Sequence, residues 1–251
     1  MLRDLDGGLQ FRGLTNWQRV QMSEQPLHFL HIPKTGGTAL RHALVNAHEY
    51  AGVRPIFWSK HIASADDILR KHKSAHLGFF VRDPVERFIS GFYSRKREGQ
   101  PRYHVPWSAA ERLAFHAFGE VDLLAEGLAQ SDPLTEAAVK SIRHTAPYYV
   151  NTFKSKASIN QIASRIAFVG QLETLEEDFD LLRRWLGLPK DVELPSSPVE
   201  AHRSDPSAKP NTSKETRTVL AKFLSREYRI YERCLKLRAS RIEFLKKAMK
   251  V

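Results

Sequence analysis

The stretch HFLHIPKTGGTAL, residues 28–40, runs from an apolar segment through a lysine and two glycines into a helical pattern. The segment LHFLHI, residues 27–32, is rich in β-forming residues and predicts a buried strand that ends at Pro33. Apolar residues at 40, 43 and 44 then have the spacing of one helix face. The stretch therefore predicts a strand, a glycine-bearing loop and a helix in direct succession.

The loop of this stretch has the composition of an oxyanion site. A helix N-terminus presents unpaired N–H groups and a partial positive charge, and Gly36 and Gly37 let the backbone approach an anion closely. Lys34 adds a full charge, and Thr35 and Thr38 add hydroxyl groups. The pattern favours a phosphate or a similar group, with a turn that binds nothing as the alternative.

The order of residues differs from the loop that binds nucleoside triphosphates with Mg²⁺. In that loop the lysine follows the glycines and a hydroxyl group ligates the metal, whereas here Lys34 precedes Gly36 and Gly37. No aspartate stands at a predicted strand end in a position to hold a metal. We therefore expect an anionic ligand that is bound without a cation.

Further strands are predicted near 53–58, at 76–81 and at 166–171, separated by helical segments. Nearly continuous apolar strands alternating with helices indicate a parallel sheet covered on both faces. After the third strand, Asp83, Pro84 and Glu86 form a helix start, and we expect this helix to reach Tyr93.

The second half of the chain is predicted to be mainly helical. We expect two or three short helices within 107–145, an acidic amphipathic helix over 175–186 and a long proline-rich loop over 189–210. A final helix is predicted to begin after Ser213 and to run toward the C-terminus. Residues 1–25 read as a poorly ordered arm or a loosely docked helix, and 26–251 as a single domain.

The composition points to an anionic partner. The 251 residues carry 39 Lys and Arg against 28 Asp and Glu, a formal net charge of +11. The single cysteine, Cys234, excludes an intramolecular disulfide and any multi-cysteine metal site. No apolar stretch has the length of a transmembrane helix or a signal peptide, so we expect a soluble, cytoplasmic protein.

Two segments together resemble a known family. HIPKTGGT, residues 31–38, is followed by VRDPVERFISGFY, residues 81–93. The pair resembles the two nucleotide-binding segments of sulfotransferases that use 3′-phosphoadenosine 5′-phosphosulfate (PAPS), in particular their carbohydrate-modifying branch. The resemblance implies an α/β, P-loop-like three-layer fold with a central, mostly parallel sheet flanked by helices.

The resemblance also assigns roles to residues of this chain. It implies that the 5′-phosphosulfate lies among five residues of the first loop, and that Arg82 and Ser90 hold the 3′-phosphate. The five residues are Lys34, Thr35, Gly36, Gly37 and Thr38. A looser likeness over 209–213 adds Lys209 and Asn211, and FVGQLETLEEDFDLL, 168–182, resembles a later strand and helix. Arg87, one turn from Ser90, is read as a salt-bridging surface residue or as part of the same site.

Sulfuryl transfer also needs a base for the acceptor hydroxyl, and histidine suits this role because its pKa lies near neutrality. The resemblance places a catalytic histidine between the two segments, which selects His61. His31 and His104 are the other candidate histidines, and Glu49 and Asp66 are candidate carboxylates. His72 and His76 have the spacing of two zinc ligands, but we read this pair as structural.

The sequence thus predicts a PAPS-dependent sulfotransferase that needs no metal and acts on a hydroxyl group, expected to be that of a carbohydrate. A nucleotide kinase-like phosphotransferase, a basic protein that binds nucleic acid and an inactive nucleotide-binding relative remain as alternatives. The basic run at 94–104 is either solvated or forms the acceptor entrance. The oligomeric state is not predicted.

Overall fold

The computed structural model describes residues 25–45, 49–50, 54–61, 63–197 and 212–249. Its centre is a sheet of four parallel strands in the order β2-β1-β3-β4. The strands are β1 (Leu27–Leu30), β2 (Ile56–Trp58), β3 (His76–Val81) and β4 (Ile166–Gln171). The predicted parallel sheet is confirmed, with a second strand shorter than expected. The arm predicted over 1–25 lies outside the described residues except for Gln25.

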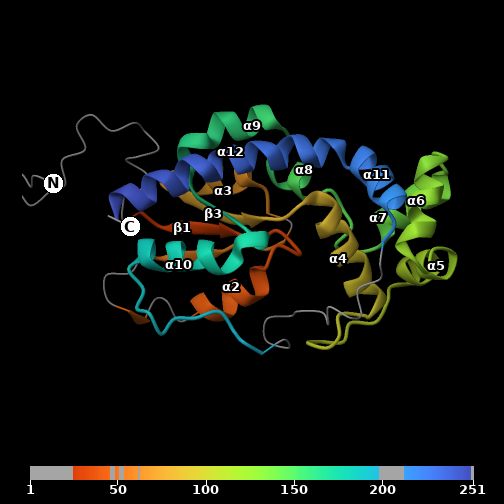
Figure 1. Cartoon of the computed structure of the whole chain (residues 1–251), viewed down its shortest axis with the longest axis horizontal. Coiled ribbons are helices and arrows are strands. Elements are labelled where there is room, and N and C mark those ends of the chain that lie inside the picture. The colour runs from red at the N-terminus through yellow and green to blue at the C-terminus, as the bar shows by residue number, and fades with distance from the viewer. Residues whose placement is uncertain (1–24, 46–48, 51–53, 62, 198–211, 250–251) are drawn as a thin grey trace, which may run out of the picture.

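Helices cover both faces of the sheet (Figure 1). On one face lie α2 (Gly37–Leu44) and α10 (Leu175–Leu186), which share a core with Phe29, Phe80 and Phe168 of the strands. The opposite face carries α3 (Ala65–Lys71), α8 (Tyr148–Phe153), α9 (Lys156–Ile162) and α12 (Ser225–Ala248). Short 3-10 helices, Ala163–Arg165 and Leu172–Thr174, flank β4. The predicted three-layer α/β arrangement is therefore present.

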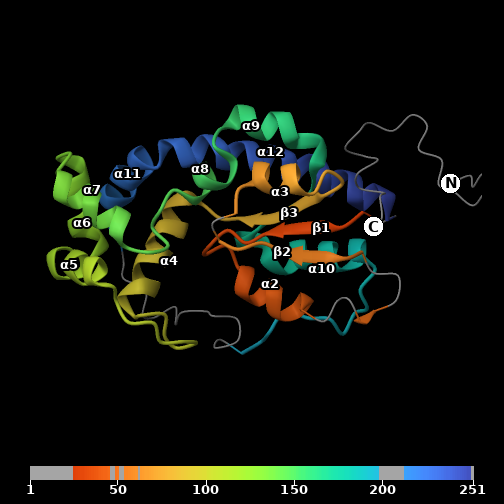
Figure 2. The same cartoon turned by 180° about the vertical axis from the view of Figure 1, so that it is seen from behind.

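A helical region extends the molecule beyond one end of the sheet, as both views show (Figures 1 and 2). It consists of α4 (Pro84–Lys96), α5 (Ala109–Ala117), α6 (Val121–Ala129), α7 (Pro133–Ser141) and α11 (Lys214–Phe223). These helices enclose a third apolar core, which includes Phe88, Phe92 and Phe115. The sequence predicts two or three short helices within 107–145, and the structure has three, α5, α6 and α7.

The start of α4 confirms the predicted cap. A carboxylate oxygen of Asp83 accepts the N–H groups of Val85 and Glu86 at 2.9 and 3.1 Å, and Pro84 occupies the first turn. The helix ends at Lys96 rather than at the predicted Tyr93. Asp83 also accepts the hydroxyl of Tyr228 at 2.8 Å, so its carboxylate ties α4 to α12.

The C-terminal helix differs from the prediction, because the structure has two helices where the sequence predicted one. Ser213 caps α11 by accepting the N–H of Thr216, as expected, but the chain leaves helical geometry at Leu224. The side chain of Leu224 is buried in the core of the helical region. This break lets α11 pack on α6 while α12 runs along β4. Among the described residues, no helix is both long and apolar enough to cross a membrane.

Sheet topology places two loops side by side. The chain passes from β1 through α2 to β2 at the sheet edge, and then through α3 to β3 on the other side of β1. In parallel sheets, ligands bind beyond the carboxyl ends of strands where the connections diverge in this way. Lys34 follows β1 and Arg82 follows β3, so the two predicted anion-binding segments meet at this point.

Candidate functional site

The loop after β1 has the backbone of an open helix N-terminus. Gly36 is the N-cap of α2 with φ 85°, and no side chain caps the helix. The first N–H groups of α2 are therefore left for an anion. A side chain at Gly36 would be strained by the positive φ, and its Cβ would lie 2.9 Å from Leu172 Cδ1. Lys34 also has a positive φ, of 69°.

Gly37 is required for a different reason. A Cβ at this position would lie 2.4 Å from the ring of His31, closer than real Cβ contacts allow. The absence of a side chain at Gly37 therefore lets the imidazole of His31 lie against the start of α2. Gly36 is therefore needed for its left-handed backbone, and Gly37 is needed because the His31 ring lies too close for a side chain.

Lys34 is a half-buried cation whose side chain has no hydrogen-bond or ion-pair partner among the described residues. Burial, followed by the nearby positive charges of Arg82 and Arg97, lowers the pKa of Lys34 to about 8. An unpaired buried charge is costly unless an opposite charge arrives. The arrangement would therefore favour the binding of an anion beside Lys34.

Arg82 lies beside this loop. Its Nη1 donates to the carbonyl oxygen of Lys34 at 3.4 Å, and its Nη2 lies 3.8 Å from the carboxylate of Glu86. Tyr149 holds the backbone of Arg82, because its hydroxyl accepts the Arg82 N–H at 2.8 Å and donates to the Arg82 carbonyl at 2.6 Å. Burial lowers the pKa of Arg82. These two long contacts do not satisfy all the N–H donors of the Arg82 guanidinium.

The hydroxyl groups near the site behave differently from one another. Thr35 is buried and its hydroxyl donates to the carbonyl oxygen of Ile32 at 2.9 Å, so this proton is engaged with the loop itself. The sequence predicts this hydroxyl as a donor to the anion, and the structure shows its proton engaged by Ile32 instead. Thr38 and Ser90 are half-buried and their hydroxyls make no hydrogen bond within the described residues. Their roles stay predictions.

Three imidazoles gather next to Lys34. The Nε2 atoms of His31 and His61 lie 3.3 Å apart with their rings nearly perpendicular, at 87°. The ring of His144 lies 5.9 Å from that of His61, centroid to centroid. Burial, then the positive charge of Lys34, lowers the pKa of His61. The base predicted from sequence and one of its alternatives, His31, are therefore in direct contact.

His144 was missed by the sequence analysis. It has a positive φ of 71°, and its buried Nδ1 has no hydrogen-bond partner. Burial and the charges of Lys34 and His61 lower the pKa of His144 to about 3. No motif surrounds it, since it comes from the loop before α8, 51 residues beyond Tyr93, the end of the second predicted segment. Only the folded chain brings it to Lys34.

Gly91 explains how that loop reaches the site. A Cβ at Gly91 of α4 would lie 2.4 Å from the carbonyl oxygen of His144. The same carbonyl accepts Nη1 of Arg87 at 3.2 Å, and Nη2 of Arg87 donates to Ala146 at 2.8 Å. Arg87 is fully buried and also pairs with Glu227 at 3.3 Å, so its reading as a surface residue is wrong. Its role is to hold the His144 loop on α4.

The basic run at 94–104 splits into different roles. Arg95 is buried and forms two hydrogen bonds with Glu111, at 2.7 and 3.0 Å, and Lys96 pairs with Glu120. The guanidinium of Arg97 has no ion-pair partner among the described residues and is near enough to Lys34 to lower its pKa. The run therefore contains two cations held in ion pairs, Arg95 and Lys96, and one without an ion-pair partner among the described residues, Arg97.

The remaining candidate bases lie elsewhere or are engaged. His104 contacts Glu98 at 2.6 Å, and Asp66 pairs with Lys154 at 2.6 Å. Glu49 is exposed and makes no contact with the three imidazoles. Lys209 and Asn211 lie outside the described residues.

No metal-binding cluster of three or more His, Cys, Asp or Glu side chains occurs in the described part of the chain. His72 and His76 have different surroundings. The ring of His72 packs on His28 at 4.6 Å between centroids, while His76 is a buried residue of β3. Cys234 of α12 is buried in the core between that helix and the sheet, and burial raises the pKa of its thiol.

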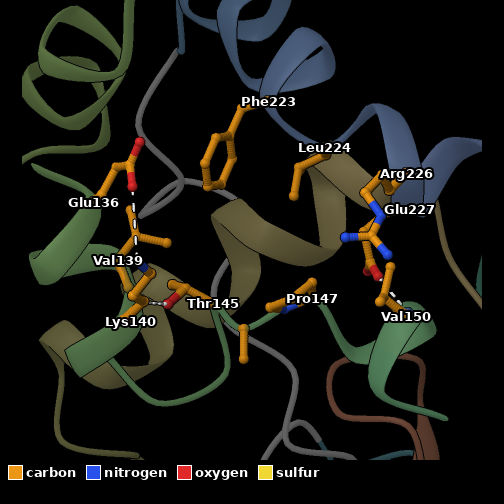
Figure 3. A pocket seen from close by; sticks show the side chains of 11 residues that line it. Glu136, Val139, Lys140, Thr145, Pro147, Val150, Phe223, Leu224, Arg226 and Glu227 are labelled. Atoms are coloured by element: carbon orange, nitrogen blue, oxygen red, sulfur yellow. Dashed lines mark hydrogen bonds and ion pairs between the residues drawn. The ribbon is translucent and has the colours of Figure 1, made fainter. Parts of the chain in front are cut away.

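A separate cavity of about 200 Å³ lies between α7, the loop before α8 and the junction of α11 with α12 (Figure 3). Phe223 and Leu224 face Pro147 across it, and Arg226 and Glu227 lie at one end (Figure 3). None of the predicted site residues lines this cavity. Its wall includes the residues that directly follow His144, namely Thr145, Ala146 and Pro147.

Comparison with known proteins identifies one family. Residues 18–233 match the sequence model of the sulfotransferase family. The matched range contains the strand β1, the loop of Lys34, the loop of Arg82 and the three clustered histidines. No curated protein and no solved structure gives a significant match.

Proposed function

Because the chain belongs to the sulfotransferase family, we propose that it transfers a sulfuryl group from PAPS to the hydroxyl group of a carbohydrate. The observation that carries this proposal is Lys34, a half-buried lysine without a carboxylate partner among the described residues, next to the uncapped N-terminus of α2. A site of this kind is complementary to the phosphosulfate end of such a donor.

The positions of the other cations support the same donor. Arg82 follows the neighbouring strand and is available to the 3′-phosphate, with Ser90 on the next helix as a second contact. The first N–H groups of α2 and the backbone of Thr35 would contact the sulfate and the 5′-phosphate. The donor therefore meets positive charge at both of its anionic ends.

The transfer itself requires three events. The acceptor hydroxyl attacks sulfur and gives its proton to His61, while the bond from sulfur to the 5′-phosphate oxygen breaks and its electron pair stays on that oxygen. Lys34 offsets the charge that grows there, a role that is worth roughly 3–4 kcal/mol where comparable donors have been removed. Proton removal by a positioned base contributes roughly 10²–10⁴-fold.

A titration of the full chain with adenosine 3′,5′-bisphosphate, compared with ATP and Mg²⁺, tests the proposed donor. We expect binding of the bisphosphate without added metal and a much weaker response to ATP. Tight binding of ATP that depends on Mg²⁺ would instead favour a phosphotransferase, and no preference for either nucleotide would favour a general polyanion-binding protein.

The acceptor class is tested with PAPS labelled with ³⁵S and a panel of desulfated glycans, with simple alcohols and phenols for comparison. We expect label on a glycan and almost none with His61→Ala, which should still bind the bisphosphate. Label that accumulates on phenols or alcohols alone would reject the carbohydrate acceptor while leaving the sulfotransferase reaction in place.

A further inference from the structure

The contact between His31 and His61 fixes which nitrogen of His61 is free to act. The two Nε2 atoms lie 3.3 Å apart and meet the criteria of a hydrogen bond. A neutral imidazole carries one N–H, so a single proton lies between these two atoms. Either His61 donates its Nε2–H to His31, or His31 donates to His61.

Only one of these arrangements leaves His61 able to act as a base while the contact is kept. If His31 donates, the lone pair of His61 Nε2 is engaged and its Nδ1 carries the proton. If His61 donates, its Nδ1 has a free lone pair, and Nδ1 has no hydrogen-bond partner within the described residues. We infer that His31 is a positioning residue that accepts Nε2–H of His61 and thereby presents Nδ1 of His61 to the acceptor hydroxyl. This inference rests on the proposed function.

The packing around His31 supports a fixed orientation. Its backbone N–H donates to Ser59 Oγ at 3.1 Å, which ties the loop after β1 to the segment that carries His61. The ring lies against Gly37, where any side chain would collide with it. The indole of Trp58 lies edge-on at 6.2 Å between centroids. The backbone of His31 is therefore anchored to Ser59, and its ring packs against Gly37 and near the edge of Trp58.

A neutral acceptor suits this location better than a carboxylate. In many enzymes an acidic side chain orients the catalytic imidazole, but here a negative charge would stand beside a donor with two anionic ends. No carboxylate contacts any of the three imidazoles in the described parts of the chain. His31 stays neutral because burial, then the charges of His61 and Arg41, lowers its pKa to about 3.

The proton balance of the step is then complete. The acceptor proton moves to Nδ1 of His61 and leaves an imidazolium, whose Nε2–H now makes a charge-assisted hydrogen bond to His31. The positive and titratable groups that face His61 are His31 and Lys34 from the loop after β1 and His144 from the loop before α8. Lys34 and His144 oppose the imidazolium, and the bond to His31 offsets part of their effect.

Imidazole ¹⁵N spectroscopy of the full, labelled chain tests the tautomer without any assay of activity. We expect neutral His61 to show a protonated Nε2 and an unprotonated Nδ1, and His31 to show the reverse. The opposite tautomer at His61 would overturn the inference.

Kinetics of His31→Leu and His31→Gln give a second test, with ³⁵S release from PAPS to a glycan or to water as the readout. His31→Leu should lower kcat about 10- to 100-fold, part of the contribution of a positioned base. It should also move the acid limb of the kcat profile to lower pH, because the imidazolium loses its acceptor. His31→Gln retains an acceptor near the position of Nε2, so it should recover much of the parent kcat and much of the parent pH profile. His42→Leu, on the exposed side of α2, is the matched control and should behave as the parent protein.

The outcomes separate this inference from the proposed function. If the parent protein transfers sulfate and His61→Ala does not, an unchanged kcat and pH profile in His31→Leu would overturn the role of His31 alone. A loss of thermal stability in His31→Leu with normal kcat would show a structural role and overturn it too. If the parent protein neither binds the bisphosphate nor releases sulfate, the proposed function fails, whatever tautomer the spectra show.

Discussion

Cations removed from solvent occupy two regions of this molecule and differ in their pairing. In the helical region, the buried Arg95 makes two hydrogen bonds with Glu111, and the buried Arg87 pairs with Glu227. Beyond the sheet, Lys34 is half-buried without a carboxylate partner among the described residues, and the positive charges of Arg82 and Arg97 act on it. A cation paired with a carboxylate holds helices together, whereas the unpaired Lys34 is the group that we propose to bind an anion.

The pKa values express the same contrast. Burial acts most strongly on Glu111 and raises its pKa, but hydrogen bonds from Arg95 and from backbone N–H groups outweigh it and bring the pKa to about 2. At Lys34, burial and like charges act in the same direction and lower the pKa to about 8. The charges of the first region are compensated within the fold, whereas we propose that a bound anion compensates Lys34 in the second.

The largest expected effect comes from breaking the paired region. Glu111→Leu leaves the charge of the buried Arg95 without a carboxylate, with only the carbonyl oxygens of Val105 and Pro106 to accept from it. This change should cost about 3–5 kcal/mol of unfolding free energy, measured by denaturant unfolding. The double variant Arg95→Met with Glu111→Leu should be more stable than Glu111→Leu alone, because no uncompensated charge remains. Equal stabilities of the single and double variants would show that the pair is not what supports α4 and α5.

Lys34→Ala should have the opposite effect to Glu111→Leu: it should lower activity without lowering stability. We expect transfer of ³⁵S to fall about 10²–10³-fold, with a thermal unfolding temperature equal to or above that of the parent, since an unpaired, half-buried charge is removed. Lys73→Ala, in an exposed turn before β3, is the control and should change neither quantity. A marked loss of stability in Lys34→Ala would place this lysine with the paired cations instead.

Arg82→Ala should weaken binding of adenosine 3′,5′-bisphosphate about 10- to 100-fold, as expected for the loss of charge-assisted hydrogen bonds. The exposed Arg112 of α5 supplies a control substitution, Arg112→Ala. Calorimetric titration measures the affinity. If Arg82→Ala bound the nucleotide as the parent does, the second segment would not be part of the site.

The smallest expected effect is a pH dependence of the same affinity. A bound anion favours protonated Lys34, so affinity should change little near pH 7, where the phosphates are still largely doubly ionised, and should fall as pH rises through about 8. Above that pH the decline approaches about tenfold per unit until the raised pKa of the complex is reached. In Lys34→Ala this decline should disappear, and a decline that persists would belong to another group.

Much of the fold could be predicted because local signals agreed with the final structure. β3 and β4 begin and end where their apolar runs do, and Asp83 caps α4 as its sequence context indicates. The break at Leu224 could not be seen, since no glycine or proline marks it and the cause is burial in a distant core. Similarly, Arg87 looks like a surface residue of an amphipathic helix until Glu227, 140 residues later, lies beside it.

The candidate site was predictable where it is local and not where it depends on the fold. Lys34, Gly36 and Gly37 stand in one loop, and their spacing alone indicates an anion. His144 carries no local pattern, and its place beside His61 depends on Gly91 and Arg87 of α4. The contact between His31 and His61 likewise depends on β1 and β2 being neighbours in the sheet.

The double hydrogen bond between Tyr149 and Arg82 has a dynamic consequence. Tyr149 and Val150 donate their N–H groups to Glu227, which also pairs with Arg87, so one chain of bonds runs from α12 through α8 to the loop after β3. Amide hydrogens of the first turn of α8 should therefore exchange slowly with deuterium even though that helix is short. When a nucleotide binds Arg82, the exchange of these amides should slow further. Hydrogen exchange in α8 would then report nucleotide binding without an assay of sulfuryl transfer.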